Sequence, residues 1–208
     1  MSNDHYFTAD PKVPFRRESF SCEAWGQRLD LVSGSGVYSR GRLDIGTSVL
    51  FRETTPPAGG RILDLGCGYG VIGLAIVTAW SREVPPVAGT VIGVDVNERA
   101  VLLANENATE LGLADRFTAG TPEALSDNAT YDEIWSNPPI RVGKAALHRL
   151  LLTWLPRLAP EGRAVLVVGK NLGADSLQRW VGDQGYPTTR VASAKGFRVL
   201  ESRRGTAT

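Results

Sequence analysis

The run DLGCGYGVIG, from Asp64 to Gly73, contains four glycines and is here called the glycine loop. Because a glycine has no Cβ, such a loop allows a tight turn and the close approach of a ligand. A helix that begins there presents free N–H groups and the positive end of its dipole. Gly68, Gly70 and Gly73 have the G-x-G-x-x-G spacing of dinucleotide-binding sites. The alternative is that these glycines only tighten a turn between a strand and a helix.

A carboxylate follows the glycine loop at the end of the next apolar run. Asp95 comes roughly 25 residues after the loop, where a carboxylate can accept hydrogen bonds from both ribose hydroxyls of a nucleoside. The alternative is that Asp95 only caps the helix expected after Asn97. Because the loop and the acid occur together, we favour a nucleoside site.

The charge of Asp64 narrows the class of nucleoside. This carboxyl group lies two residues before Gly66, where it would repel a pyrophosphate and attract a cation. S-adenosylmethionine carries a sulfonium and an ammonium and lacks a pyrophosphate, so the charges favour it over NAD. The motif Asp-x-Gly-x-Gly-x-Gly, with Gly-Val-Asp-Val-Asn after it, resembles the class I S-adenosylmethionine-dependent methyltransferases. The resemblance implies cofactor contacts at Asp64, Gly66, Cys67, Gly68, Gly70, Asp95, Val96 and Asn97. In this set Cys67 is interpreted as a filler of the loop and not as a nucleophile, since direct methyl transfer needs no covalent step.

The sequence Asn137-Pro138-Pro139, here called the Asn-Pro-Pro corner, follows another predicted strand. Two prolines stiffen the backbone and remove two N–H donors, so carbonyls in the corner are free to accept, and the Asn137 side chain adds an acceptor. Convergent acceptors suit a planar NH2 group: they favour a pyramidal nitrogen and aim its lone pair at the methyl carbon. The three residues are therefore the candidate catalytic group. The alternative is a rigid turn that only ends a strand.

This corner resembles the Asn-Pro-Pro motif of methyltransferases that act on exocyclic amino or amide nitrogens. Ile140 stands where Tyr or Phe is common, which argues against the adenine and glutamine branches. The wider run from Asn137 to Lys144, with His148 and Arg149 beyond it, is similar to the methyltransferase small domain group. This group includes the RsmC-type 16S rRNA guanine-N2 methyltransferases. Segments 5–7, 36–39 and 43–47 of this chain also resemble the N-terminal part of that group.

The resemblance implies transfer of a methyl group to the N2 amine of a guanine in 16S rRNA. The expected partner is ribosomal RNA or a small-subunit assembly intermediate. A protein-glutamine or small-molecule N-methyltransferase is the first alternative. A non-catalytic binding module that retains the fold is the second, and an NAD-dependent oxidoreductase is more distant.

Further site residues rest on the same resemblance. Asp44 and Thr47 would close over the methionine end of the cofactor, or Thr47 would only start a helix after a turn. Thr121 would lie near the adenine, and Asn137 would contact the cofactor in addition to orienting the amine. The expected substrate contacts are Tyr38, Ile140, Arg141 and Lys144.

The spacing of apolar residues predicts the elements that position these groups. Strands are expected at 61–66, 90–95, 116–119, 131–136 and 163–168, with helical patterns between them. Such alternation predicts an α/β fold with a mostly parallel sheet of seven strands and helices on both faces. The last two strands, 188–193 and 197–201, are expected to form a hairpin at its edge. A helix is expected through the apolar positions from 147 to 158.

Residues 1–55 do not fit the alternation and are interpreted as a β-rich N-terminal extension, with strands at 28–32 and 37–38. Residues 56–208 would form the Rossmann-like core, and both parts would belong to one methyltransferase domain spanning 1–208. A Pro- and Gly-rich stretch at 56–60 would join them.

Composition limits the function classes. The 208 residues carry a formal net charge of +1, with two cysteines and two histidines. This argues against a general nucleic-acid coat and against a metal site. A polar start and the lack of a long apolar run predict a cytoplasmic protein with no membrane segment, and we favour a monomer. Charge is uneven along the chain: residues 83–136 carry a balance of −8, and residues 137–208 carry +8.

Overall fold

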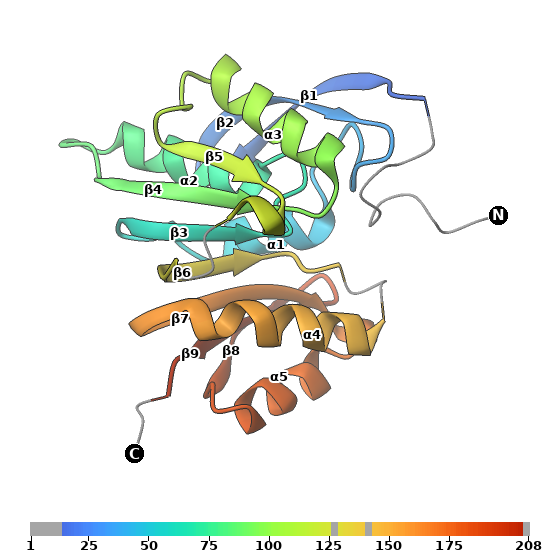
Figure 1. Ribbon diagram of the computed structural model, residues 1–208, viewed down its shortest axis with the longest axis vertical. Helices are drawn as coiled ribbons and strands as arrows, with labels where there is room; N and C mark the ends of the chain where they lie inside the picture. The colour runs from blue at the N-terminus through green and yellow to red at the C-terminus, as the bar shows by residue number, and fades with distance from the viewer. Residues whose placement is uncertain (1–13, 126–128, 140–142, 206–208) are drawn as a thin grey trace.

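The computed structural model describes residues 14–125, 129–139 and 143–205 of the chain (Figure 1). A seven-stranded sheet has the order β5-β4-β3-β6-β7-β9-β8. Neighbouring pairs from β5 to β7 are parallel, and β9 is antiparallel to both β7 and β8. The strands are β3 (Gly60–Leu65), β4 (Gly89–Val94), β5 (Phe117–Gly120), β6 (Tyr131–Ser136), β7 (Leu158–Gly169), β8 (Thr188–Ala194) and β9 (Phe197–Arg203). The predicted mostly parallel sheet with an edge hairpin is confirmed.

Helices cover both faces of this sheet. They are α1 (Ile45–Glu53), α2 (Val71–Arg82), α3 (Glu98–Glu110), α4 (Lys144–Trp154) and α5 (Ala174–Asp183). Alternate residues of each central strand point to opposite faces, so Ile62 packs with α1, α2 and α3, while Leu63 packs with α4 and α5. The central strands are therefore buried on both faces, which explains apolar runs such as 164–168 in β7.

A separate two-stranded sheet precedes the main one. It is the antiparallel hairpin of β1 (Arg17–Ala24) and β2 (Gln27–Gly34), which lies beside α3 (Figure 1). The side chain of Asn107 in α3 bonds to both the N–H and the C=O of Val32 at 2.8 and 2.9 Å. The hairpin is thus fixed to the core by a side chain that replaces a neighbouring strand.

Two sequence-based expectations about elements are wrong in detail, and one strand was not expected. Residues 37–38 form a turn and not a strand, because Gly36 takes a positive φ of 80° there. The strand β1 was not expected, since only one face of it meets the core. The helix expected to reach Leu158 ends at Trp154 and continues as a 3₁₀ turn over Leu155–Arg157. Pro156 has no N–H to extend an α-helix, so Leu158 instead begins β7.

Within the described part of the chain, no helix is long and apolar enough to cross a membrane. The division into an extension and a core stays a prediction. The segment 14–55 holds the β1–β2 hairpin and also α1, whose first residues face the carboxyl ends of the central strands.

Candidate active site

A cavity of about 870 Å³ opens where the parallel strands end. The strands β4, β3 and β6 are adjacent, so the segments that follow them meet at one edge of the sheet, where open α/β sheets hold ligands. Segment 37–45, which leads into α1, forms the facing wall. Of the predicted site residues, the cavity is lined by Tyr38, Asp44, Thr47, Gly66, Cys67, Gly68, Asp95, Val96, Asn97, Asn137, Pro138 and Pro139.

The glycine loop serves two physical purposes. Gly68 has a φ of +56°, and a Cβ built on it would meet no atom within 4 Å, so its backbone faces open space in the cavity. A Cβ on Gly73 would lie 2.5 Å from the Phe117 ring. Gly73 therefore allows α2 to pack closely on the sheet, and neither it nor Gly70 lines the cavity.

Asp95 links the glycine loop to α3. Its Oδ2 accepts the N–H of Gly68 and its Oδ1 accepts the N–H of Asn97, both at 2.9 Å. Burial raises the pKa of Asp95, and the backbone hydrogen bonds oppose this shift. The N-cap of α3 is Asn97, which accepts from the N–H groups of Arg99 and Ala100. Asp95 is therefore not the cap itself, and it lines the cavity beside Gly68 and Val96.

Asp64 lies behind the glycine loop and does not line the cavity. It is fully buried, and its Oδ2 accepts the N–H of Gly73 at 2.8 Å. Its Oδ1 has no partner among the described residues. Burial raises the pKa of this carboxyl group to about 7. The carboxyl group thus binds the backbone in the first turn of α2 and does not face the cavity.

Asn137 is held by two acceptors on the facing wall. Its Nδ2 donates to Asp44 Oδ2 at 2.7 Å and to Thr47 Oγ1 at 3.0 Å. Asp44 is also the N-cap of α1, and its other oxygen accepts the Tyr38 hydroxyl at 2.7 Å. Segment 37–45 and the Asn-Pro-Pro corner are therefore one hydrogen-bonded unit.

Some predicted residues lie elsewhere. Thr121 does not line the cavity, although Pro122 next to it does. Lys144 is exposed at the first turn of α4, outside the cavity. Ile140 and Arg141 lie outside the described residues.

Part of the cavity wall could not be predicted from the sequence. Leu172, in the turn after β7, and Phe197, the first residue of β9, also line the cavity. Neither residue belongs to a recognisable motif. Leu172 lies at this edge because it follows β7, which is parallel to β6. Phe197 reaches the same edge because β9 pairs antiparallel with β7, which brings Phe197 opposite Gly169.

The described ranges contain no group of three or more His, Cys, Asp or Glu residues that could hold a metal ion. Cys67 is buried, and burial together with the nearby Asp64 and Asp95 raises the pKa of its thiol well above the usual value. A protonated thiol is a poor nucleophile.

The sheet order, the glycine loop with Asp95 and the Asn-Pro-Pro corner define the class I methyltransferase architecture. The model of the methyltransferase small domain family matches residues 28–201, and the chain belongs to this family. By family it is therefore a class I S-adenosylmethionine-dependent methyltransferase.

Known relatives agree with this assignment. The chain is 30% identical to the uncharacterized protein YbxB of Bacillus subtilis, over 97% of this chain and 99% of that protein. It is 33% identical to ribosomal RNA small subunit methyltransferase C of Pseudomonas aeruginosa, over 94% of this chain but 57% of that protein. The chain thus spans little more than half the length of this second relative.

Among solved structures, the fold is similar to that of the 16S rRNA N2 G1207 methyltransferase RsmC of T. thermophilus, in complex with AdoMet and guanosine. The TM-score is 0.72 at 24% identity, and the match covers 93% of this chain and 52% of that one. The similarity confirms the predicted fold.

Proposed function

We propose that this protein transfers the methyl group of S-adenosylmethionine to the exocyclic N2 amine of a guanine in 16S ribosomal RNA. The observation that carries the proposal is the fixed amide of Asn137, which turns its NH2 toward Asp44 and leaves Oδ1 as an acceptor at the cavity. The names of the relatives support the guanine and the 16S rRNA as the target. An rRNA substrate implies action in the cytoplasm.

The cavity fits the cofactor by size and by the chemistry of its walls. At about 870 Å³ it is large enough for a nucleoside with an amino-acid tail. In this proposal Asp95 binds the ribose hydroxyls. The cofactor lies close to the backbone of Gly66 and Gly68, where no side chain is in the way. Val96, Asn97 and the segment of Thr121 and Pro122 would lie around the adenosine, with Thr47 near the methionine end. When bound, the cofactor supplies the methyl group as an electrophile.

The residues of the corner act on the amine. The Asn137 Oδ1 and the carbonyl before Pro138 would each accept one hydrogen of the NH2 group, which orients the nitrogen lone pair. The N–H becomes acidic only as the N–C bond forms, so the departing proton can pass through these acceptors to solvent. No strong base is required, and Pro138 and Pro139 contribute by keeping the acceptors rigid.

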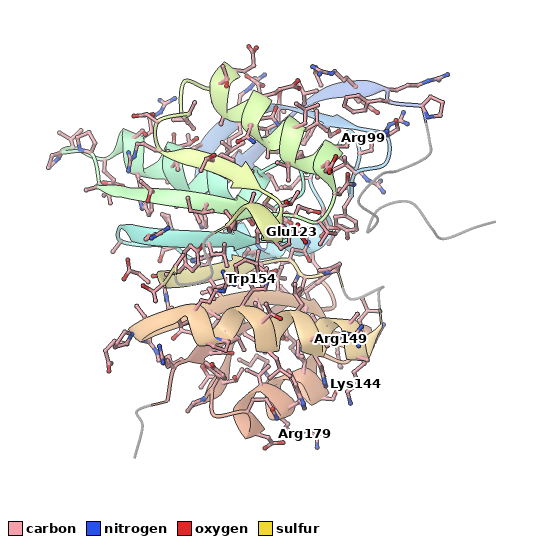
Figure 2. All side chains as sticks on the ribbon, in the orientation of Figure 1. Arg99, Glu123, Lys144, Arg149, Trp154 and Arg179 are labelled. Atoms are coloured by element: carbon pink, nitrogen blue, oxygen red, sulfur yellow. The ribbon has the colours of Figure 1, made fainter. Side chains whose placement is uncertain are left out.

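Basic side chains outside the cavity suit a phosphate backbone. Figure 2 shows Lys144 at the start of α4, Arg149 farther along the same helix, and Arg179 on α5. The stacked rings of His148 and Trp180 show that the two helices are neighbours. None of the three forms an ion pair with another described residue. We propose that they and Arg141 contact RNA phosphates, and that Tyr38 and Ile140 flank the target base.

Convergent acceptors suit a glutamine side-chain amide as well as a guanine amine, so the test must separate RNA from protein. Purified protein with methyl-labelled S-adenosylmethionine is given naked 16S rRNA, small ribosomal subunits or a total protein extract. The proposal predicts label in RNA, recovered as N2-methylguanosine after digestion. Label only in the protein extract contradicts it.

A further inference from the structure

Asp44 makes more contacts in the site than a helix cap requires. Its Oδ2 accepts the N–H of Gly46 at 2.7 Å and that of Thr47 at 3.3 Å, which caps α1. The same oxygen accepts the Asn137 amide at 2.7 Å, and Oδ1 accepts the Tyr38 hydroxyl at 2.7 Å. Both oxygens are therefore engaged, and the carboxylate is held from two sides.

The chemistry of this contact sets the orientation of the amide. A carboxylate bonded in this way only accepts, so Asn137 must present its NH2 group to Asp44. Its Oδ1 then points away from Asp44. If the amide turned over, its oxygen would face the carboxylate and its NH2 would enter the site. Two donor groups, that NH2 and the substrate amine, would then oppose each other.

The backbone around Asp44 is shaped for this contact. A Cβ on Gly46 would lie 2.9 Å from Asp44 Oδ2 and 3.3 Å from Asn137 Nδ2. The same Cβ would lie 2.9 Å from the Phe197 ring. Only a residue without a side chain therefore fits where the carboxylate meets the amide.

We propose that Asp44 is a positioning residue for methyl transfer: it fixes the amide of Asn137 so that Oδ1 faces the acceptor amine. This inference rests on the proposed function, in which Asn137 orients the amine. It differs from the expectation that Asp44 contacts the methionine end of the cofactor, because the effect of Asp44 passes through another side chain. The site consequently selects a group that donates two hydrogens.

Two substitutions separate this effect from helix capping. Serine also caps helices well, so Asp44→Ser should keep the start of α1. The serine side chain is, however, too short to reach Asn137. Asp44→Asn keeps both a cap and an acceptor oxygen at the original reach. Asp115→Ser is the matched control, since Asp115 is exposed in the turn before β5, away from the cavity. Circular dichroism and melting temperature confirm that all three variants fold.

The measurements are kcat at saturating cofactor and the Kd for S-adenosylmethionine by calorimetry. We expect Asp44→Ser to lower kcat by about 30-fold or more, with Kd within about threefold, while Asp44→Asn restores most of the rate. A Kd weakened about tenfold, with kcat recovered at saturation, overturns the proposal in favour of a cofactor ligand. An unchanged kcat in Asp44→Ser also overturns it.

A spectroscopic readout keeps the inference independent of the substrate. The NMR signals of the Asn137 side-chain NH2, assigned by their loss in Asn137→Ser, should be shifted and protected from exchange in the native protein. We expect both properties to disappear in Asp44→Ser and to persist in Asp115→Ser. If the native protein methylates no RNA, the proposed function fails, but this readout still decides the contact. An unchanged Asn137 signal in Asp44→Ser overturns the inference.

Discussion

The side-chain amide of Asn137 donates a 2.7 Å hydrogen bond to the carboxylate of Asp44, across 93 residues of sequence. The bond joins the corner after β6 to the cap of α1. Segment 37–45, which precedes the core sheet in the sequence, therefore forms part of the site.

The first prediction concerns Asn137. We expect Asn137→Ala to abolish methyl transfer, because it removes the acceptor that orients the amine, and to leave the affinity for S-adenosylmethionine nearly unchanged. Calorimetry and labelled-methyl turnover measure the two effects separately. Undiminished turnover in the variant would remove Asn137 from the mechanism.

The second prediction concerns Asp95. Asp95→Ala should weaken cofactor binding by about 1.5–3 kcal/mol, the scale for loss of a charged hydrogen-bond partner. Because Asp95 also accepts the N–H of Gly68, Asp95→Asn is a useful second variant that keeps one acceptor and is expected to lose less affinity. An unchanged Kd in Asp95→Ala would show that the ribose is held elsewhere.

The third prediction concerns pH and Asp64. Burial raises the pKa of Asp64 to about 7, so between about pH 4 and 7 the folded protein keeps a proton that the unfolded chain releases. The stabilisation that comes from this retained proton is fully present below pH 4 and is lost as pH rises through 7.

The variant Asp64→Asn has no such proton. Relative to the native protein, its free energy of unfolding should therefore improve by up to about 1.4 kcal/mol per pH unit within this window. Urea unfolding between pH 5 and 8 measures the difference, with Asp115→Asn as the exposed control. Parallel curves for Asp64→Asn and the native protein would show that Asp64 titrates normally.

The fourth prediction concerns the basic side chains on α4 and α5. Lys144→Glu, Arg149→Glu and Arg179→Glu should each raise the KM for RNA and lower its salt dependence, since each removes a phosphate contact. Cofactor affinity should stay the same. The control is Arg82→Glu, at the exposed end of α2. Equal effects of the control and the three variants would indicate that only net charge matters.

Much of the core could be predicted from local sequence. The run 131–136 forms the strand β6 with the predicted bounds. Tyr131, Ile134 and Trp135 favour a strand, and the prolines that follow Asn137 prevent it from continuing. The glycine loop, Asp95 and the Asn-Pro-Pro corner were expected at one edge, since parallel strands bring their ends together.

The rest of the site depends on contacts between distant segments. The pairing of Asp44 with Asn137 leaves no local pattern, and Phe197 reaches the cavity only through the order of the antiparallel strands. The buried position of Asp64 could not be predicted either. Its charge suggested a ligand contact, whereas packing of the loop places it behind the backbone of Gly73.

The most direct test of methyl transfer to guanine in 16S rRNA is nucleoside mass spectrometry of this RNA from a strain that lacks the gene. We expect that one N2-methylguanosine disappears from the RNA. It should return when the native gene is supplied and stay absent when the Asn137→Ala form is supplied. A full complement of N2-methylguanosine in the deletion strain would contradict the account.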